Sequence, residues 1–278
     1  MSDGINLINQ KIDEHHADKS AHTRRQLVGG AAATLASMGL LGLAESASAD
    51  GGAGGIGGLT KAQFSASNTP ERILAVAATA EVLATIVNTV GWEKGLGGDE
   101  TTQRNIRAAA REELLHYHTL GFLGGKPLTK KIWVPDAVFA DRTSFLSTLE
   151  VGDQIFVNAY LIGTVAFGFA GLGQEAAIAA EFMGVEAVHR ALARQSLGKL
   201  GNDRVFIRFD NPEQAPDAPN KGQSGFRSIN GAVAQLQAAG FGFGVAGKGA
   251  GQFYDFDEVR RRTPDDPDVN TRKLDPLG

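Results

Sequence analysis

The chain has 278 residues, a formal net charge of −4 and no cysteine. The lack of cysteine excludes disulfides, thiolate metal sites, iron–sulfur clusters and a cysteine nucleophile, so a metal would have to bind through histidine, carboxylate or backbone oxygen. The nearly balanced charge argues against a general nucleic-acid-binding protein, and we expect no nucleic-acid partner.

The N-terminal segment has the features of an export signal. A twin arginine within residues 23–28, TRRQLV, precedes a weakly apolar run rich in Gly and Ala over residues 27–43. The small residues at 47–49, ASA, fit a signal-peptidase cleavage site. The twin arginine resembles a Tat signal. This predicts a Tat-type signal peptide over residues 1–49, the Tat export machinery as a partner, and a periplasmic or extracellular location.

The apolar run in this signal is short and diluted by Gly and Ala, so no stable membrane span is expected after cleavage. An uncleaved N-terminal anchor is the alternative. The segment that follows, residues 50–67, opens with the Gly-rich string DGGAGGIGG. It is predicted to be a flexible linker.

Four long helical patterns follow the linker. The first starts at Thr69, with Pro70 in the favoured first helical position. The second and the fourth each follow a Gly-containing turn. The four patterns cover residues 69–90, 101–123, 143–166 and 173–197.

The lengths of the connections predict how these helices are arranged. The first and second helices, and the third and fourth, are joined by short turns and should be antiparallel neighbours. About 20 residues, beginning with GKPL, separate the second helix from the third, which is long enough to cross the length of a bundle. Two hairpins joined by one long crossover form the ferritin-like version of an all-α four-helix bundle, which we predict for residues 68–200.

The last part of the chain, residues 201–278, is predicted to be an irregular and partly disordered extension. It contains a Pro-rich loop, a short helical pattern over residues 226–239 and a polar tail. Gly242, Gly244 and Gly247 match the spacing of a dinucleotide-binding loop. They follow a helical pattern rather than a strand, so we interpret them as a helix cap and loop instead.

Each of the four helical patterns places an acid on its apolar face, and two of them add a histidine three residues later. In the second and fourth patterns these pairs fall within the 3-4-3-4 spacing of a buried helical stripe. The second pair follows the first by 73 residues. The residues that face the expected core are Glu81, Glu113, His116, Asp153, Glu186 and His189.

Such a cluster needs positive charge. Four buried acids without cations would repel one another and stay partly protonated, at a high cost in free energy. Two divalent ions remove this problem, because a bridging carboxylate can bind both ions and a histidine three residues away on the same face can cap one. The oxygen and imidazole donors suit iron or manganese. The six residues therefore predict a dimetal site, with two divalent Fe or Mn ions as cofactors.

Other interpretations of these residues stay open. Each Glu–His pair could be a salt-bridged pair in the core, and Glu150 could replace Asp153 as the acid of the third helix. Glu112 is interpreted as solvated and His118 as a surface or supporting residue. Tyr160, on the inner stripe of the third helix, is interpreted as core packing or as a hydrogen-bonding or redox-active neighbour of the metals.

Several strings between residues 68 and 200 resemble the bacterial ferritin-like domain family that also includes plant desiccation-related proteins. They are EELLH, GKPL, FADRTSFLSTL, VNAYLIGT and GVEAVHRAL. The resemblance implies one Glu from each of two helices and Glu-x-x-His from each of the other two. The pattern carries over to Glu81, Glu113, His116, Glu186 and His189, whereas the third-helix acid, Asp153, is one methylene shorter than the expected Glu.

Together with the export signal, the resemblance leads us to expect an exported protein whose dimetal centre handles O₂ or peroxide in stress protection. The alternative is a non-enzymatic stress or desiccation-related envelope protein with a degenerate or structural metal site. Iron storage in a ferritin-type cage is a weaker interpretation. Whether the chain is an enzyme, and whether it forms a homo-oligomer, are left open by the sequence.

Overall fold

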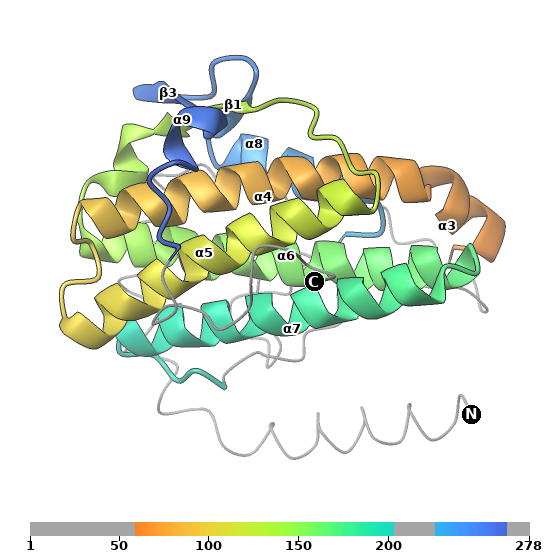
Figure 1. Ribbon diagram of the computed structural model, residues 1–278, viewed down its shortest axis with the longest axis horizontal. Coiled ribbons are helices and arrows are strands. Elements are labelled where there is room, and N and C mark those ends of the chain that lie inside the picture. Colours follow the sequence, from red (N-terminus) through yellow and green to blue (C-terminus); the bar gives the residue numbers. More distant parts are fainter. Residues whose placement is uncertain (1–58, 203–225, 266–278) are drawn as a thin grey trace, which may run out of the picture.

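The computed structural model describes residues 59–202 and 226–265, and four long helices lie side by side along most of its length (Figure 1). The predicted signal peptide, residues 1–49, lies outside the described residues. The long helices are α4 (Pro70–Glu93), α5 (Glu100–Phe122), α6 (Arg142–Phe169) and α7 (Gly173–Ser196). Their ends lie within three residues of the predicted ends.

The four helices form two antiparallel hairpins. Helix α4 packs against α5 and α6 packs against α7, with a short turn inside each pair. The chain leaves α5 at one end of the molecule and returns along its length before α6 begins (Figure 1). This arrangement matches the predicted hairpins and long crossover.

Local sequence explains where the long helices start. Three of them begin after a polar residue whose side chain accepts a hydrogen bond from a backbone N–H of the first turn. These N-cap residues are Thr69, Asp99 and Asp141. Pro70 follows Thr69, where its missing N–H costs nothing and its fixed φ suits the helix.

Helix α4 forms the apolar centre of the molecule. In the described part of the chain it is the helix that is long and apolar enough to cross a membrane by length and composition, and 83% of its most apolar window is buried inside the structure. A core helix of this kind gives the same hydropathy as a membrane span. At Gly91 an added side chain would collide with the ring of Phe145 on α6, so glycine permits the close approach there.

A small antiparallel sheet departs from the all-α prediction. Strand β1 (Lys131–Pro135) and the 3-10 helix η2 (Asp136–Phe139) lie within the crossover. Within the described residues, β1 pairs with β2 (Gly242–Phe243) on one side and β3 (Gly251–Asp255) on the other. The sequence did not predict this sheet because it joins segments more than a hundred residues apart, and β2 is only two residues long.

The three glycines of the apparent dinucleotide motif belong to this sheet region. Gly242 is in β2, and Gly244 has a positive φ of 73°. A side chain at Gly247 would overlap the carbonyl oxygen of Gly240. The glycines therefore allow a tight backbone turn at the sheet.

Shorter helices surround the four long ones. Helix α3 (Lys61–Ser67) lies inside the segment predicted to be a linker, which is therefore helical over 61–67, with a capping box at Thr60. Helix α8 (Ile229–Ala238) confirms the short helix predicted over 226–239 and packs against α4 and α6.

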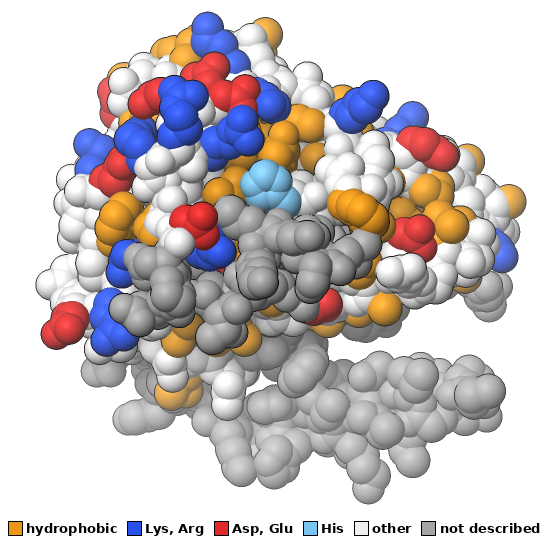
Figure 2. Space-filling model, viewed as in Figure 1, with side chains coloured by type: hydrophobic (Ala, Val, Ile, Leu, Met, Phe, Trp, Pro, Cys, Tyr) orange, Lys and Arg blue, Asp and Glu red, His pale blue; other side chains and the backbone are white. Residues whose placement is uncertain are grey.

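The described part of the C-terminal extension is ordered and tied to the helices. Helix α9 (Phe256–Val259) packs against α4. Arg262 contacts Glu93 of α4 at 2.8 Å, and Lys130 contacts Asp257 at 3.1 Å. Basic and acidic side chains lie side by side on the upper part of the face in Figure 2. Within residues 226–265 the predicted short helix is therefore present as α8, whereas β2, β3 and α9 were not predicted; residues 203–225 and 266–278 lie outside the described residues.

Candidate metal centre

Four of the six predicted ligands converge in the interior between the two hairpins. Glu81 comes from α4, Glu113 and His116 from α5, and Glu186 from α7. Each offers one donor atom, and these atoms all lie within 4.8 Å of one another. All four side chains are buried, as the helical stripes predicted. The residues can therefore hold a metal ion.

The two glutamates between the histidines present one oxygen to each of them. His116 Nδ1 lies 3.4 Å from Glu113 Oε2 and 3.4 Å from Glu186 Oε1. His189 Nδ1 lies 3.2 Å from Glu113 Oε1 and 3.6 Å from Glu186 Oε2. Glu113 and Glu186 thus each span the gap between His116 and His189, which is the arrangement of a bridging carboxylate.

The separations between the donor atoms, and the lack of hydrogen bonds to several of them among the described residues, suit a bound cation. Two donors that each bind one ion at about 2.1 Å lie roughly 3.0 Å apart at octahedral angles and about 3.4 Å apart at tetrahedral angles. Most of the measured separations are near these values and longer than an ordinary hydrogen bond. Among the described residues, several buried donor atoms of the cluster lack a hydrogen-bond partner. They are Glu81 Oε2, Glu113 Oε2, both carboxylate oxygens of Glu186, His116 Nδ1 and His189 Nδ1.

Glu81 lies on the His116 side of the cluster. Its Oε1 is 3.6 Å from His116 Nδ1 and accepts a short hydrogen bond from the hydroxyl of Tyr160. Burial, and then the charge of Glu113, raise the pKa of Glu81 to about 7. Tyr160 is thus both a core residue and a hydrogen-bond donor to a candidate ligand.

Asp153 is placed differently from the other predicted ligands. It is buried on α6 but does not belong to the group of four. Burial, and then the nearby charge of Glu186, raise the pKa of Asp153 well above its usual range. Its side chain is one methylene shorter than the Glu that the resemblance implies at this position. The alternative acid, Glu150, instead forms ion pairs with Arg194 and Lys199.

Glu112 was wrongly interpreted as a solvated bystander. Its side chain is only 33% exposed, and its Oε2 lies 2.7 Å from His189 Nε2. Because a carboxylate can only accept, Nε2 donates, and Nδ1 is left facing Glu113 and Glu186. Burial tends to raise the pKa of Glu112, but the hydrogen bond from His189 lowers it overall. No local spacing signals this contact, because His189 lies on α7, 77 residues further along the chain.

The acids control the charge of both histidines. Burial alone would lower the pKa of His116, but the surrounding carboxylates, first of all Glu81, raise it well above its usual value. The same holds for His189, where Glu112 gives the largest upward effect. Without a metal the surrounding acids therefore favour the protonated form of both rings, and a metal ion would have to displace those protons.

The two histidines have different surroundings. His116 stacks on Phe182 with ring centroids 3.9 Å apart and meets Tyr160 edge-on. His189 has the hydrogen bond to Glu112 instead. His118 lies away from the cluster, partly buried, and contacts the ring of Tyr117. The two halves of the cluster therefore differ although their Glu-x-x-His spacing is the same.

Comparison with known proteins adds no family assignment. No family profile, no curated protein and no solved structure matches the chain. The functional argument therefore rests on the buried carboxylate and histidine cluster itself.

Proposed function

We propose that this chain is an exported ferritin-like four-helix-bundle protein with a carboxylate-bridged dimetal centre of iron or manganese, which handles O₂ or peroxide in stress protection. One observation carries the proposal: Glu113 and Glu186 each turn one oxygen toward His116 and the other toward His189. The hairpin arrangement and the family resemblance support the same assignment.

The side chains would divide the work as follows. Glu113 and Glu186 would bridge the two ions, with Glu81 and His116 completing one side. Asp153 and His189 would complete the other, directly or through water. Two redox-active ions would supply the paired oxidation-state change that O₂ or peroxide chemistry requires.

The protein groups around the centre have their own tasks. Glu112 would orient the ring of His189 and fix its tautomer, as carboxylates commonly do for metal-bound histidines. Tyr160 would orient Glu81 through its hydroxyl. Phe182 would exclude water from the face of His116.

Elemental analysis of the purified protein tests the metal assignment. Protein produced with ample iron and manganese should contain about two ions per chain. The Glu113→Ala, Glu186→Ala double variant should contain none. Glu181→Ala, an exposed position on the same helix as Glu186, is the control and should keep both ions. Metal-free wild-type protein would rule the proposal out.

Export is a separate part of the proposal and has its own test. It rests on the twin arginine at Arg24 and Arg25, ahead of the apolar run. Replacing both with Lys should retain the protein inside the cell if the Tat machinery carries it. Unchanged export of the variant would refute this part alone.

A second candidate function is favoured by the position of Asp153. Because Asp153 lies outside the group of four, the site could hold one ion firmly and serve a structural role in a non-enzymatic stress or desiccation-related envelope protein. Asp153→Glu separates the two. If the centre holds two ions and the second is bound weakly, the longer side chain of Glu should strengthen the binding of the second ion in a metal titration. Asp153→Asn should abolish the binding of that ion. An unchanged single ion in both variants would favour the structural function.

A further inference from the structure

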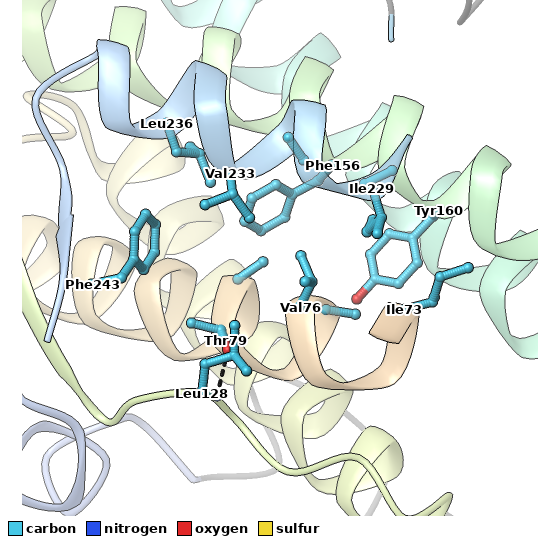
Figure 3. Close-up of a pocket in the computed structure, with 14 residues that line it drawn as sticks. Ile73, Val76, Thr79, Leu128, Phe156, Tyr160, Ile229, Val233, Leu236 and Phe243 are labelled. Atoms are coloured by element: carbon cyan, nitrogen blue, oxygen red, sulfur yellow. Dashed lines mark hydrogen bonds between the residues drawn. The ribbon is translucent and has the colours of Figure 1, made fainter. Parts of the chain in front are cut away.

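An apolar cavity of about 50 Å³ lies between α4, α6 and α8. Figure 3 shows α8 across the top, with side chains from α4 and α6 converging beneath it. Its lining includes Val76 from α4, Phe156 from α6 and Leu236 from α8. Leu128, which is 68% exposed, lies at its margin and marks the side nearest to solvent.

The cavity offers nothing to a water molecule. Its polar lining side chains are Thr79 and Tyr160. The hydroxyl of Thr79 donates to the carbonyl of Ala75 at 2.7 Å and accepts from the backbone N–H of Leu128 at 2.8 Å. The hydroxyl of Tyr160 donates to Glu81. A buried water needs roughly two to four polar partners, so this space favours a small apolar occupant.

The same cavity lies next to the candidate metal centre. The ring of Tyr160 forms part of the cavity wall, and its hydroxyl contacts Glu81 Oε1, which faces His116. A single side chain therefore separates an apolar space from a candidate ligand.

A second cavity provides an internal contrast. It has a volume of about 40 Å³ and shares Phe156 and Leu236 with the first. Its lining includes Asp153 and Asn88, and the Oδ1 atom of Asn88 is buried without a hydrogen-bond partner among the described residues. This second space suits water, which could complete the contact between Asp153 and an ion.

We propose that the cavity between α4, α6 and α8 binds dioxygen beside the metal centre. A volume of about 50 Å³ accommodates a molecule of a few heavy atoms, and dioxygen is small and apolar. The choice of dioxygen rests on the proposed function. The binding of a small apolar molecule depends only on the shape and polarity of the cavity.

Xenon is the probe, because it reports apolar cavities without any chemistry. Crystals of the metal-free full chain are pressurised with xenon, and the anomalous signal locates the gas. Wild-type protein should hold xenon between α4, α6 and α8 and not beside Asp153. Ala232→Leu, which fills the first cavity from α8, should remove this peak. Ala239→Leu, which enters the second cavity from the same part of the chain, should leave it in place.

Each result of the xenon experiment either supports or overturns binding in the cavity between α4, α6 and α8. If Ala232→Leu fails to fold, as judged by circular dichroism, Ala159→Leu fills the same cavity from α6. Absence of xenon from the wild-type cavity, or a peak only beside Asp153, overturns the proposal. With metal bound, Ala232→Leu should slow oxygen consumption without lowering the metal content. A wild-type chain that binds xenon but no metal would refute the dimetal function and leave apolar binding intact.

Discussion

Glu112 and Glu113 are neighbours in the sequence but have different partners. Glu113 is almost fully buried and turns an oxygen to each histidine. Glu112 is partly exposed and accepts from the outer nitrogen of His189. A one-residue step along the helix thus separates a candidate metal ligand from a residue that would orient another ligand.

The first prediction concerns Glu112. In Glu112→Gln the amide accepts a weaker hydrogen bond than the carboxylate, so His189 should become less basic and less well oriented. Metal affinity at the His189 side should fall by roughly 10- to 100-fold, while the His116 side is retained. Stepwise manganese titration measures this, with Glu181→Gln as the control. Two equally tight ions in the variant would contradict the role given to Glu112.

A second prediction at the residue scale concerns pH and the metal-free protein. The folded-state pKa of Glu81 is raised from 4.5 to about 7, so the protonated acid favours the folded state. This contribution is fully present below pH 4.5 and is lost as the pH rises through about 7. The raised pKa values of His116 and His189 act in the same direction.

The expected result is a lower unfolding temperature for metal-free protein at about pH 8 than at about pH 6. Glu81→Gln is neutral at both values and should show a smaller drop. Saturation with manganese should also reduce the drop, since the ions replace the protons. Equal or greater stability of the metal-free wild type at the higher pH would show that the cluster does not cause the pH dependence of stability.

At the scale of elements, Asn68 joins the start of α8 to the junction of α3 and α4. It is buried, and its Oδ1 accepts from the backbone N–H of Ile229 at 2.8 Å. Its Nδ2 donates to the carbonyls of Phe64 and Arg227, each at 3.0 Å. One side chain therefore fixes α8 in the position where it covers the apolar cavity.

Removing this junction gives a third prediction. Asn68→Ala takes away the side-chain partner of the Ile229 N–H and of the Arg227 carbonyl, while the Phe64 carbonyl keeps the backbone N–H of residue 68, and the change should lower the free energy of unfolding by about 1–3 kcal/mol. Urea unfolding measures the loss, and hydrogen exchange at the amide of Ile229 should become faster. Ser67→Ala, at the neighbouring position, should change little. Unaltered exchange at Ile229 would show that α8 is held by apolar packing alone.

The long helices could be predicted from sequence, and the sheet could not. Periodic apolar stripes and caps such as Thr69 and Asp99 are local signals that fix the ends of a helix. Strand β2 has two residues, and its partner β1 lies in the crossover more than a hundred residues earlier. Pairing of this kind depends on contacts across the fold, and no local pattern reports it.

The sequence likewise identified part of the candidate site and missed the rest. The Glu-x-x-His pairs and Glu81 were found because an acid on an apolar stripe is conspicuous. Glu112 was missed because helical phase alone does not show which residues of a neighbouring helix lie opposite. Asp153 is buried as predicted, but its absence from the group of four could only come from the structure.

At the scale of the whole molecule, neither hairpin holds the cluster alone. The α4–α5 hairpin supplies Glu81, Glu113 and His116, and the α6–α7 hairpin supplies Asp153, Glu186 and His189. Ions bound between them would hold the two hairpins together. An ion present at about 100 times its dissociation constant would add roughly 2.7 kcal/mol to the stability of the folded chain.

Anomalous diffraction from crystals loaded with manganese tests the central claim most directly. The account predicts two peaks about 3.5–4 Å apart, one beside His116 and the other beside His189, with Glu113 and Glu186 in contact with both. No peak between the hairpins, or a peak that neither glutamate contacts, would contradict it.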